Sequence, residues 1–491
     1  MNAGNKRDRM GTMPVGRLLA VTAVPMMISM LVQALYNVVD SLYVSRVSQE
    51  ALNAVSMAFP LQTLMIGVGI GTAVGTNALL SRHLGEKRTD LAERSANTGL
   101  LLSIATSLVF ALIGIAFSGV YFKSINSASF RSAELIGDEL ERAAEIARVQ
   151  SIVDYGTAYC TVCLSFSMGF FLQATFERML TATNRSHLAM ICQVCGALTN
   201  IVLDPVFIFG KEISIFGAHI LTIPAFEVKG AAIATVIGQF VAGGLAMIFV
   251  LTKVREVRIR VREIRWHTAT VKMIYKIGLP SIIMQCVGSV MNYCMNLILI
   301  TFTDTATAFF GVYYKLQSFV FMPVFGLNNG MVPIISYNYG ARQPERLWKT
   351  VKLSLAVAIT IMSLGCLVFE LMPETLMKLF HASGELTAMG RHGLRIIGVH
   401  FPIAAYCIIM GSVFQAVGDP NHSMLTSICR QLLVLLPATW LLSRLGNVDY
   451  VWFAFPIAEI VSCTLSTVFL RSTIKKLNAE IGSPKTELAE A

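Results

Sequence analysis

Charged residues are scarce in this chain. Asp, Glu, Lys and Arg make up only 14% of its 491 residues, whereas a soluble globular domain carries about 25%. Hydrophobic residues make up 55% of the chain, and its mean hydropathy is +0.64. This composition excludes an ordinary soluble domain. It predicts a polytopic membrane protein, in which each spanning helix needs about 20 mostly apolar residues.

The motifs of several enzyme and cofactor classes are absent. The chain has no glycine-rich nucleotide loop after a strand, no Walker sequence and no HExxH. Its ten cysteines lie in apolar segments and do not form two paired CxxC motifs, so we interpret them as small packing residues. No cleavable signal peptide is evident, because the N-terminus is polar and basic. We therefore predict no enzyme activity, no cofactor and no metal beyond a possible Na⁺.

Lys and Arg are unevenly distributed along the chain. The formal net charge of +10 could suggest a nucleic acid partner, but the basic residues sit mainly in alternate loops between apolar segments. This pattern is typical of membrane topology, because cytoplasmic loops carry an excess of Lys and Arg. We predict a multi-pass protein of the cell membrane that has both termini in the cytoplasm and binds no nucleic acid.

Long apolar stretches predict twelve membrane-spanning helices. Their expected ranges are 18–45, 53–81, 95–118, 156–181, 187–209, 230–252, 271–300, 306–336, 350–372, 391–416, 422–444 and 450–474. The predicted fold class is an all-α polytopic membrane protein.

One stretch of the chain, residues 25–86, occurs twice, 255 positions apart. Seven pairs match without a gap: Pro25 and Pro280, Asn37 and Asn292, Gln62 and Gln317, Gly71 and Gly326, Gly75 and Gly330, Ser81 and Ser336, and Gly85 and Gly340. Such self-similarity indicates two homologous halves. Each half has six helices, an even number, so both enter the membrane from the same side and the repeat is parallel. Asp40 has no counterpart in the second half, where Met295 takes its place.

The repeat suggests where the halves divide. We predict an N-terminal tail at 1–17, an N-lobe at 18–252, a linker at 253–267, a C-lobe at 268–474 and a C-terminal tail at 475–491. The basic linker is expected to be an amphipathic segment on the cytoplasmic membrane surface.

The first half carries an insertion between its third and fourth helices, roughly residues 119–155. Asn184–His187 resembles Asp419–His422 at an offset of 235 rather than 255, so the first half holds 20 extra residues. Charges recur at helical spacing after Ile136, which predicts a short extracellular surface helix. A tolerated insertion without a function is the alternative.

Carboxylates inside membrane helices are costly and usually mark a pathway. A helical rise of about 1.5 Å per residue puts Asp40 about 35 Å and Asp204 about 26 Å from the cytoplasmic ends of their helices. Asn200 lies one turn before Asp204, and Thr235 lies about one turn into the next helix. These four oxygen-bearing side chains share one level and suit a proton or Na⁺. Alternatively, Asp204 and Pro205 only cap and kink the helix.

Two further carboxylates have less certain roles. Glu459 lies about 14 Å from the outer end of the last helix, where it could line a cavity for cationic substrates or form a hydrogen bond between helices. Glu177 and Arg178 are adjacent near the inner end of the fourth helix and are expected to form an interfacial or snorkelling pair. The predicted substrate-cavity residues are Asn37, Gln62, Gln173, Gln239, Asn292 and Glu459.

The ordered set of motifs resembles the MATE (multidrug and toxic compound extrusion) family, nearest to its prokaryotic MepA-like branch. The residues that carry the resemblance are Asn37–Asp40, Ser81–Gly85, Asn200–Pro205, Gly230–Thr235 and Ser336–Gly340. The resemblance implies two six-helix bundles that face a central cleft and work by alternating access. It also implies an ion-coupling site at Asp40, Asn200, Asp204 and Thr235. The acidic residues that some members use in the seventh, eighth and tenth helices are missing within those helices here, since the nearest, Asp419, lies at a helix end.

The resulting functional hypothesis is a secondary active antiporter. It exports amphipathic organic cations in exchange for H⁺ or Na⁺, and a monomer in the lipid bilayer would suffice. One alternative is a lipid-linked oligosaccharide flippase of the same superfamily, which should carry several cationic residues in its cavity, whereas the charges noted inside the helices are mainly acidic. An intramembrane enzyme is the other alternative, but it would need paired catalytic groups at one depth.

Overall fold

The fold is known from a computed structural model that describes residues 9–215, 218–259, 265–379 and 384–482. Ten helices in this part of the chain are long and apolar enough to cross a membrane. Two bent helix pairs bring the number to twelve when each pair is taken as one span. The predicted helical membrane fold with twelve spans is therefore confirmed.

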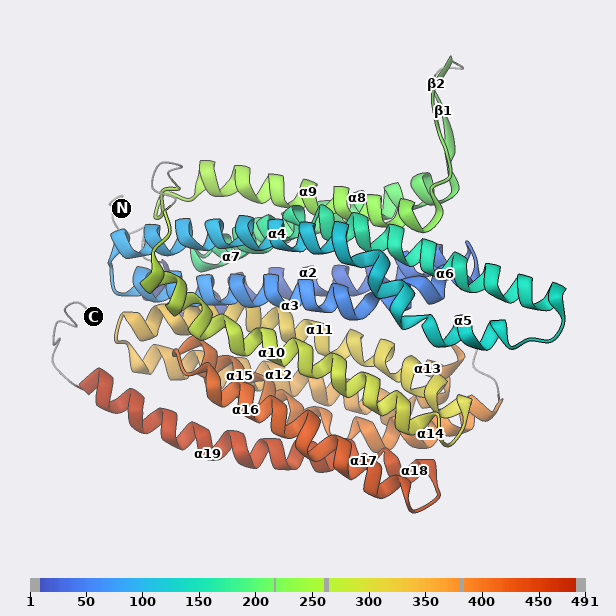
Figure 1. Ribbon diagram of the computed structural model, residues 1–491. Helices are drawn as coiled ribbons and strands as arrows, with labels where there is room; N and C mark the ends of the chain where they lie inside the picture. The colour runs from blue at the N-terminus through green and yellow to red at the C-terminus, as the bar shows by residue number, and fades with distance from the viewer. Residues whose placement is uncertain (1–8, 216–217, 260–264, 380–383, 483–491) are drawn as a thin grey trace.

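The helices of the first half run side by side in Figure 1. Its spans are α2 (Val15–Ser45), α3 (Gln49–Gly85), α4 (Thr89–Ile125), the pair α6 (Glu139–Ser165) and α7 (Met168–Ala182), α8 (Ser186–Phe209) and α9 (Glu227–Lys253). Short helices α1 (Arg9–Thr12) and α5 (Ser127–Glu134) accompany them.

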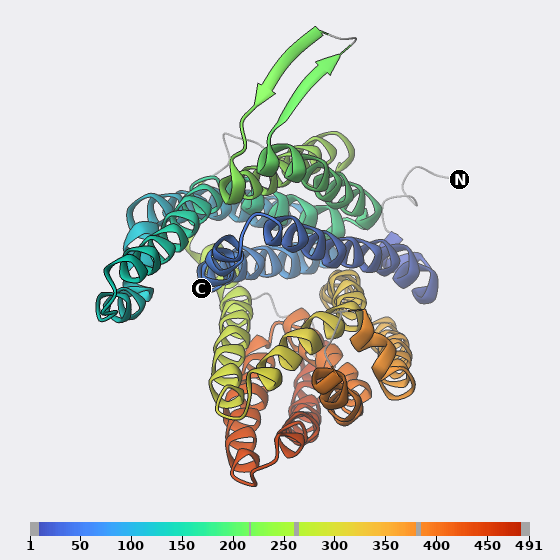
Figure 2. The same cartoon turned by 90° about the vertical axis from the view of Figure 1, so that its right-hand side faces the viewer.

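The second half is built from shorter pieces. Its elements are α10 (Thr268–Leu299), α11 (Asp304–Gly340), α12 (Pro344–Leu371), α13 (Pro373–Lys378), the pair α14 (Gly384–Gly398) and α15 (Phe401–Ala416), α16 (Pro420–Ile428), the π-helix η2 (Cys429–Leu435), α17 (Leu436–Ser443), α18 (Val448–Val451) and α19 (Ala454–Gly482). Figure 2 shows this half, yellow to red, on one side of the molecule and the blue and green helices of the first half on the other.

Two predicted spans are bent rather than straight. The span expected at 156–181 consists of α6 and α7, which meet at 44°, and the span expected at 391–416 consists of α14 and α15, which meet at 48°. In the second pair Pro402 lies in the first turn of α15. Proline has no backbone N–H and disfavours helical geometry in the residue before it, so one helix ends and another begins here.

The sequence repeat reappears as identical local geometry. Lys87 and Arg342, which are 255 positions apart, both adopt the left-handed conformation just after their helices, with φ of 59° and 54°. The same three backbone hydrogen bonds close the ends of α3 and α11, and they satisfy carbonyl groups that a helix end leaves free.

The later part of the repeat needs a correction of one residue. Asn184 and Gly418 are the left-handed residues that precede α8 and α16, with φ of 58° and 84°. Ser186 begins α8 and Pro420 begins α16. The structural offset is therefore 234 positions and not the predicted 235. The predicted alignment followed similar residue types, whereas the turn geometry fixes the register.

The two halves touch through reciprocal glycine contacts at the end where the chain begins. A Cβ added to Gly85 would lie 2.0 Å from Tyr337 O, and one added to Gly340 would lie 2.2 Å from Arg82 O. Gly340 and Tyr337 lie 255 positions after Gly85 and Arg82, so the two contacts join equivalent residues of the two halves. Four more glycines at this spacing make the deeper contacts: Gly71 and Gly75 of α3 against α10, and Gly326 and Gly330 of α11 against α2.

A polar cluster surrounds this junction. Arg82 lies 5.0 Å from the centroid of the Tyr339 ring, and its guanidinium Nε is 2.9 Å from Glu86 Oε1. His83 Nδ1 is 3.1 Å from Glu86 Oε2. Burial raises the pKa of Glu86, but the hydrogen bonds with His83 and Arg82 outweigh burial and lower this pKa below its ordinary value. The contacts of Glu86 thus stay within the end of α3, and the cation–π contact of Arg82 with Tyr339 adds to the close packing between the halves.

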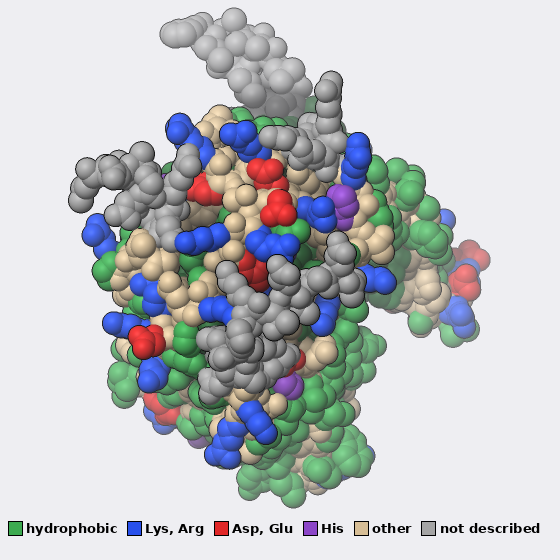
Figure 3. All heavy atoms as spheres, turned by 90° about the vertical axis from the view of Figure 1, so that its left-hand side faces the viewer, with side chains coloured by type: hydrophobic (Ala, Val, Ile, Leu, Met, Phe, Trp, Pro, Cys, Tyr) green, Lys and Arg blue, Asp and Glu red, His purple; other side chains and the backbone are tan. Residues whose placement is uncertain are grey.

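Both termini lie at the same end of the molecule (Figure 1). Figure 3 looks onto this end and shows many Lys and Arg side chains spread over it, with fewer Asp and Glu. The loops after α3, α9 and α11 belong to the same end, because an even number of spans separates each of them from the N-terminus.

The structure describes three connections between the spans. The charged part of the insertion is not a separate surface helix, since it forms the first turns of α6 and continues into the membrane-spanning part. A two-stranded hairpin, β1 (Lys211–Ile215) and β2 (Ala218–Ile223), joins α8 to α9 and projects from the helices in Figure 1. The described parts of the linker, 254–259 and 265–267, contain no helix or strand, and residues 260–264 lie outside the described part.

Arg346 ties the start of the chain to the second half. Its Nη2 donates to the carbonyl oxygens of Met10 and Met13, both at 2.8 Å, and its Nε donates to Asn338 Oδ1 at 3.2 Å. Hydrogen bonds from a charged group contribute about 1.5–3 kcal/mol each. The segment before α2 is thus held to α11 and α12.

Replacing Arg346 with Gln is expected to lower the free energy of unfolding by about 2 kcal/mol, because these carbonyl oxygens lose a charged donor. Thermal unfolding of the purified protein in detergent would show a lower Tm than wild type. Lys349→Gln, an exposed change on the same helix, should leave Tm unchanged. Equal Tm values for both variants would contradict the assigned role.

Candidate functional site

Three of the four predicted ion-coupling residues form one hydrogen-bonded group. Asn200 and Asp204 lie one turn apart on the buried face of α8, which continues through Pro205. Asn200 Nδ2 donates to Asp204 Oδ1 at 3.3 Å and to Thr235 Oγ1 of α9 at 3.2 Å. Asp204 is fully buried. The helices approach closely enough because glycines face each other there: a Cβ on Gly238 would lie 2.7 Å from Gly196 O.

Asp40 reaches the same group from α2. Helix α2 packs along α8, and the charges of Asp40 and Asp204 are close enough to interact. Asp40 Oδ1, Asn200 Oδ1 and Asp204 Oδ2 are buried and accept no hydrogen bond from the described residues. An unsatisfied buried acceptor costs about 1–3 kcal/mol. Three such oxygens, two of which belong to the carboxylates of Asp40 and Asp204, therefore favour a proton or a hard cation at this position.

A polar chain that the sequence analysis missed leads along α2 to this group. Gln193 of α8 donates to Gln33 Oε1 at 2.8 Å and accepts a hydrogen bond from Ser29. Tyr36 forms a side-chain hydrogen bond with Gln33. Ser29, Gln33, Tyr36 and Asp40 follow helical spacing on one face of α2. That spacing was a usable signal, since polar residues at this period are rare in an apolar helix.

The six predicted cavity residues have different surroundings in the structure. Asn37 is exposed on α2, and Gln239 is half-buried on α9. Gln173 Nε2 donates to Glu177 Oε1 at 3.0 Å. Of the remaining three, Gln62 lines a cavity of the first half, and Asn292 and Glu459 lie near Arg430 in the second half.

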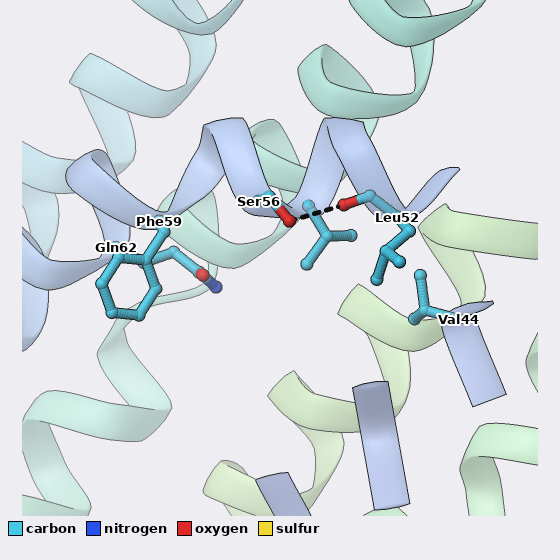
Figure 4. A pocket seen from close by; sticks show the side chains of 6 residues that line it. Val44, Leu52, Ser56, Phe59 and Gln62 are labelled. Atoms are coloured by element: carbon cyan, nitrogen blue, oxygen red, sulfur yellow. Dashed lines mark hydrogen bonds between the residues drawn. The ribbon is translucent and has the colours of Figure 1, made fainter. Parts of the chain in front are cut away.

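Gln62 lines a cavity of about 350 Å³ between α2 and the first part of α3. Figure 4 shows Gln62, Phe59, Ser56 and Leu52 along α3 and Val44 beside them. The Ser56 hydroxyl donates a hydrogen bond to the Leu52 carbonyl oxygen at 2.8 Å. Gln62 Nε2 donates to the Tyr159 hydroxyl at 3.1 Å. The cavity is mainly apolar and has one amide at its end, a lining that suits an amphipathic solute.

Glu177 and Arg178 have separate hydrogen-bond partners. Glu177 accepts a hydrogen bond from Gln173, and Arg178 Nη1 donates to Asn329 Oδ1 of α11 at 2.8 Å. The predicted interfacial pair is therefore not the main interaction of either side chain. Arg178 instead links the first half to the second.

Glu459 has a partner that the sequence analysis did not consider. Arg430 Nη1 lies 3.3 and 3.4 Å from the two carboxylate oxygens of Glu459. Arg430 belongs to η2, and Tyr314 forms a side-chain hydrogen bond with Asn292 nearby. The ion pair agrees with the second of the two alternatives for Glu459, a hydrogen bond between helices, and identifies Arg430 as the partner.

The described residues contain no group of three or more His, Cys, Asp and Glu side chains arranged to hold a metal ion. The described cysteines are all free thiols.

Known proteins resemble the chain over almost its whole length. A "FAD transporter" of Shewanella oneidensis is 24% identical over 457 residues, which cover 93% of this chain and 94% of that protein. "Multidrug export protein MepA" of Staphylococcus haemolyticus is 23% identical over 463 residues, which cover 94% of each. A solved structure described as the outward-facing conformation of a multidrug resistance MATE family transporter superposes with a TM-score of 0.84 at 23% identity, covering 96% of this chain and 99% of that one.

The family match falls on both halves of the repeat. The MatE family profile matches residues 25–206 and 280–441, which include α2 to most of α8 and their counterparts in the second half. Family, fold and repeat agree, and the members are transporters rather than enzymes. The chain belongs to the MATE family of membrane transporters.

Proposed function

We propose that this transporter is a secondary active antiporter that exports amphipathic organic cations in exchange for H⁺ or Na⁺. The observation that carries the proposal is the set of buried oxygens on Asp40, Asn200 and Asp204, which accept no hydrogen bond from the described residues. Ion binding there would neutralise carboxylate charge, and substrate and ion could then bias one conformational equilibrium in opposite directions. Thr235 holds Asn200 in position for that role.

The substrate class rests on the charges near the site and on the relatives. Asp40 lies one turn before Val44, which lines the apolar cavity of α2 and α3, and a carboxylate beside an apolar lining suits a cationic amphiphile. Relatives at 23–24% identity carry names as different as multidrug export protein and FAD transporter, so the substrate has to be measured. Organic cations are the first class to test.

The proposed topology has both termini in the cytoplasm of a cell membrane. The end of the molecule that carries the termini also gathers Lys and Arg (Figure 3), and cytoplasmic loops carry such an excess. In this orientation Asp40 and Asp204 lie in the outer half of the membrane. Both lobes belong to one chain, so a monomer suffices for transport.

The flippase alternative is weaker. Substrates with a diphosphate headgroup would need several free cationic groups in the interior. The structure places Arg178 and Arg430 there; Arg178 donates to Asn329, and Arg430 keeps unused donors although its charge is paired with that of Glu459. The interior carboxylates outnumber these two arginines.

Ethidium efflux tests the proposal. Cells without their own pumps, loaded with ethidium, should lose the dye several-fold faster with the protein than with an empty vector. A protonophore should abolish the difference if H⁺ drives export. Removal of Na⁺ should abolish it if Na⁺ does. Efflux that equals the vector control would contradict export of organic cations, and efflux that survives both treatments would contradict ion coupling.

A further inference from the structure

The Arg430 and Glu459 pair lies near the middle of the membrane. Arg430 is about ten residues into the span that begins at Pro420, which corresponds to roughly 15 Å at the helical rise. Glu459 is about eleven residues, roughly 16 Å, into the span Val448–Lys475 from the opposite end, and its side chain is 4% exposed. Charged groups at this depth face a water-filled space or a partner, because the lipid interior does not solvate them.

The backbone around Arg430 is unusual. Residues Cys429–Leu435 form a π-helix between α16 and α17. A π-helical turn inserts an extra residue and gives up favourable α-helical geometry, and such turns occur often at functional sites. Here it lies beside α19 and α10, and it carries the one arginine of this span that reaches Glu459.

Much of the guanidinium remains available. Only Nη1 of Arg430 contacts Glu459, at 3.3 and 3.4 Å, which is longer than the 2.7–2.9 Å of a tight charged hydrogen bond. Its Nε and Nη2 form no hydrogen bond with the described residues, and the side chain is 27% exposed. Tyr314, which is 38% exposed, lies close to Arg430 and adds an aromatic face. The Arg430 side chain is therefore partly accessible and has donors that its partner in the described residues does not use.

We propose that Arg430 is the anchor of a subsite in the C-lobe that binds the carboxylate or phosphate group of a transported amphiphile. The anionic group takes the donors that Glu459 leaves unused. Arginine suits this role because its planar fork matches both anions. The inference rests on the proposed export function and extends its substrates from cations to molecules that bear an anionic group.

Glu459 also competes with the anionic group. A carboxylate next to the arginine repels a second anion. Removal of the Glu459 charge should therefore tighten anion binding, whereas removal of the Arg430 charge should weaken it. If the pair served only to hold helices together, either substitution would weaken the binding of every ligand.

Two xanthene dyes of opposite charge make a matched test on the purified full-length protein in detergent. Carboxyfluorescein carries carboxylates, and rhodamine 123 is a cation with the same ring core. Fluorescence anisotropy gives the Kd of each. We expect Arg430→Gln to weaken carboxyfluorescein binding at least about tenfold, the loss of one charged hydrogen bond, with rhodamine 123 unchanged. Glu459→Gln should tighten carboxyfluorescein binding, and Arg444→Gln, an exposed change at the end of the same span, should alter neither.

The outcomes separate this proposal from the export mechanism. It is overturned if wild type does not bind carboxyfluorescein, if Arg430→Gln binds it as wild type does, or if both dyes weaken together. Arg430→Lys, which keeps the charge without the fork, should retain part of the binding in case the Gln variant misfolds, as judged by size-exclusion chromatography. Binding in detergent needs no ion gradient, so it does not depend on coupling through Asp40.

Discussion

Ion-coupled efflux should fall by up to about 100-fold in Asp40→Asn, at the upper range of coupling between two sites. Asn cannot take up a proton, and it removes one of the two carboxylates that would attract Na⁺. The fold should survive the change, because Asn has the shape of Asp and an uncharged amide costs less to bury than a carboxylate. The expected variant is folded but uncoupled.

Ethidium efflux from pump-deficient cells measures the effect at matched expression. Asp154→Asn is the control, because Asp154 is an exposed aspartate outside this group. Retained ethidium binding by the purified Asp40 variant would show that coupling, rather than substrate recognition, is lost. Unchanged efflux would refute the N-lobe mechanism.

The second large effect is expected at the glycines where the halves meet. An added Cβ at Gly85 would sit 2.0 Å from Tyr337 O, and the obstacle is backbone, which cannot rotate away. Overpacking costs about 1–3 kcal/mol, so Gly85→Ala should disfavour the contact between the halves by roughly tenfold or more in population. Gly340→Ala should have the same effect, because its contact with Arg82 O is the reciprocal one.

Spin labels can report the separation of the halves. The labelled positions are Asp90 and Glu345, equivalent exposed sites 255 positions apart, each changed to Cys in a background without the ten native cysteines. Either glycine variant should move the measured distances to longer values and slow ethidium efflux. Gly244→Ala, where a Cβ meets nothing within 4 Å, should change neither. If the distances equal those of wild type, the contact accommodates the added methyl group without separation of the halves, and the prediction is wrong.

The large features of the fold could be read from the sequence because they leave periodic or compositional signals. Twelve apolar stretches, the 255-position repeat and the oxygen-bearing residues at one depth all follow from residue type and spacing. Asn200, Asp204 and Thr235 do come into contact in the structure. Their role in ion coupling stays a prediction.

Other features left weaker signals or none. A π-helix has no distinct residue pattern, so the turn of Arg430 towards Glu459 could not be foreseen. The hairpin did have a signal: Ile213, Ile215 and Ile220 lie among polar residues between two helices, a composition typical of strands. Of the bends in two spans, only the one at Pro402 has a residue that marks it in the sequence.

The reciprocal glycine contacts bear on the origin of the chain. Gly85 of the first half touches Tyr337 of the second, and the equivalent residues Gly340 and Arg82 touch in the same way. The interface is therefore self-complementary. Such an isologous surface is what a homodimer with twofold symmetry presents. An ancestral six-helix protein could therefore have paired with its own copy through the forerunners of Gly85 and Tyr337. After fusion, each half was free to diverge, and only one kept the aspartate at position 40.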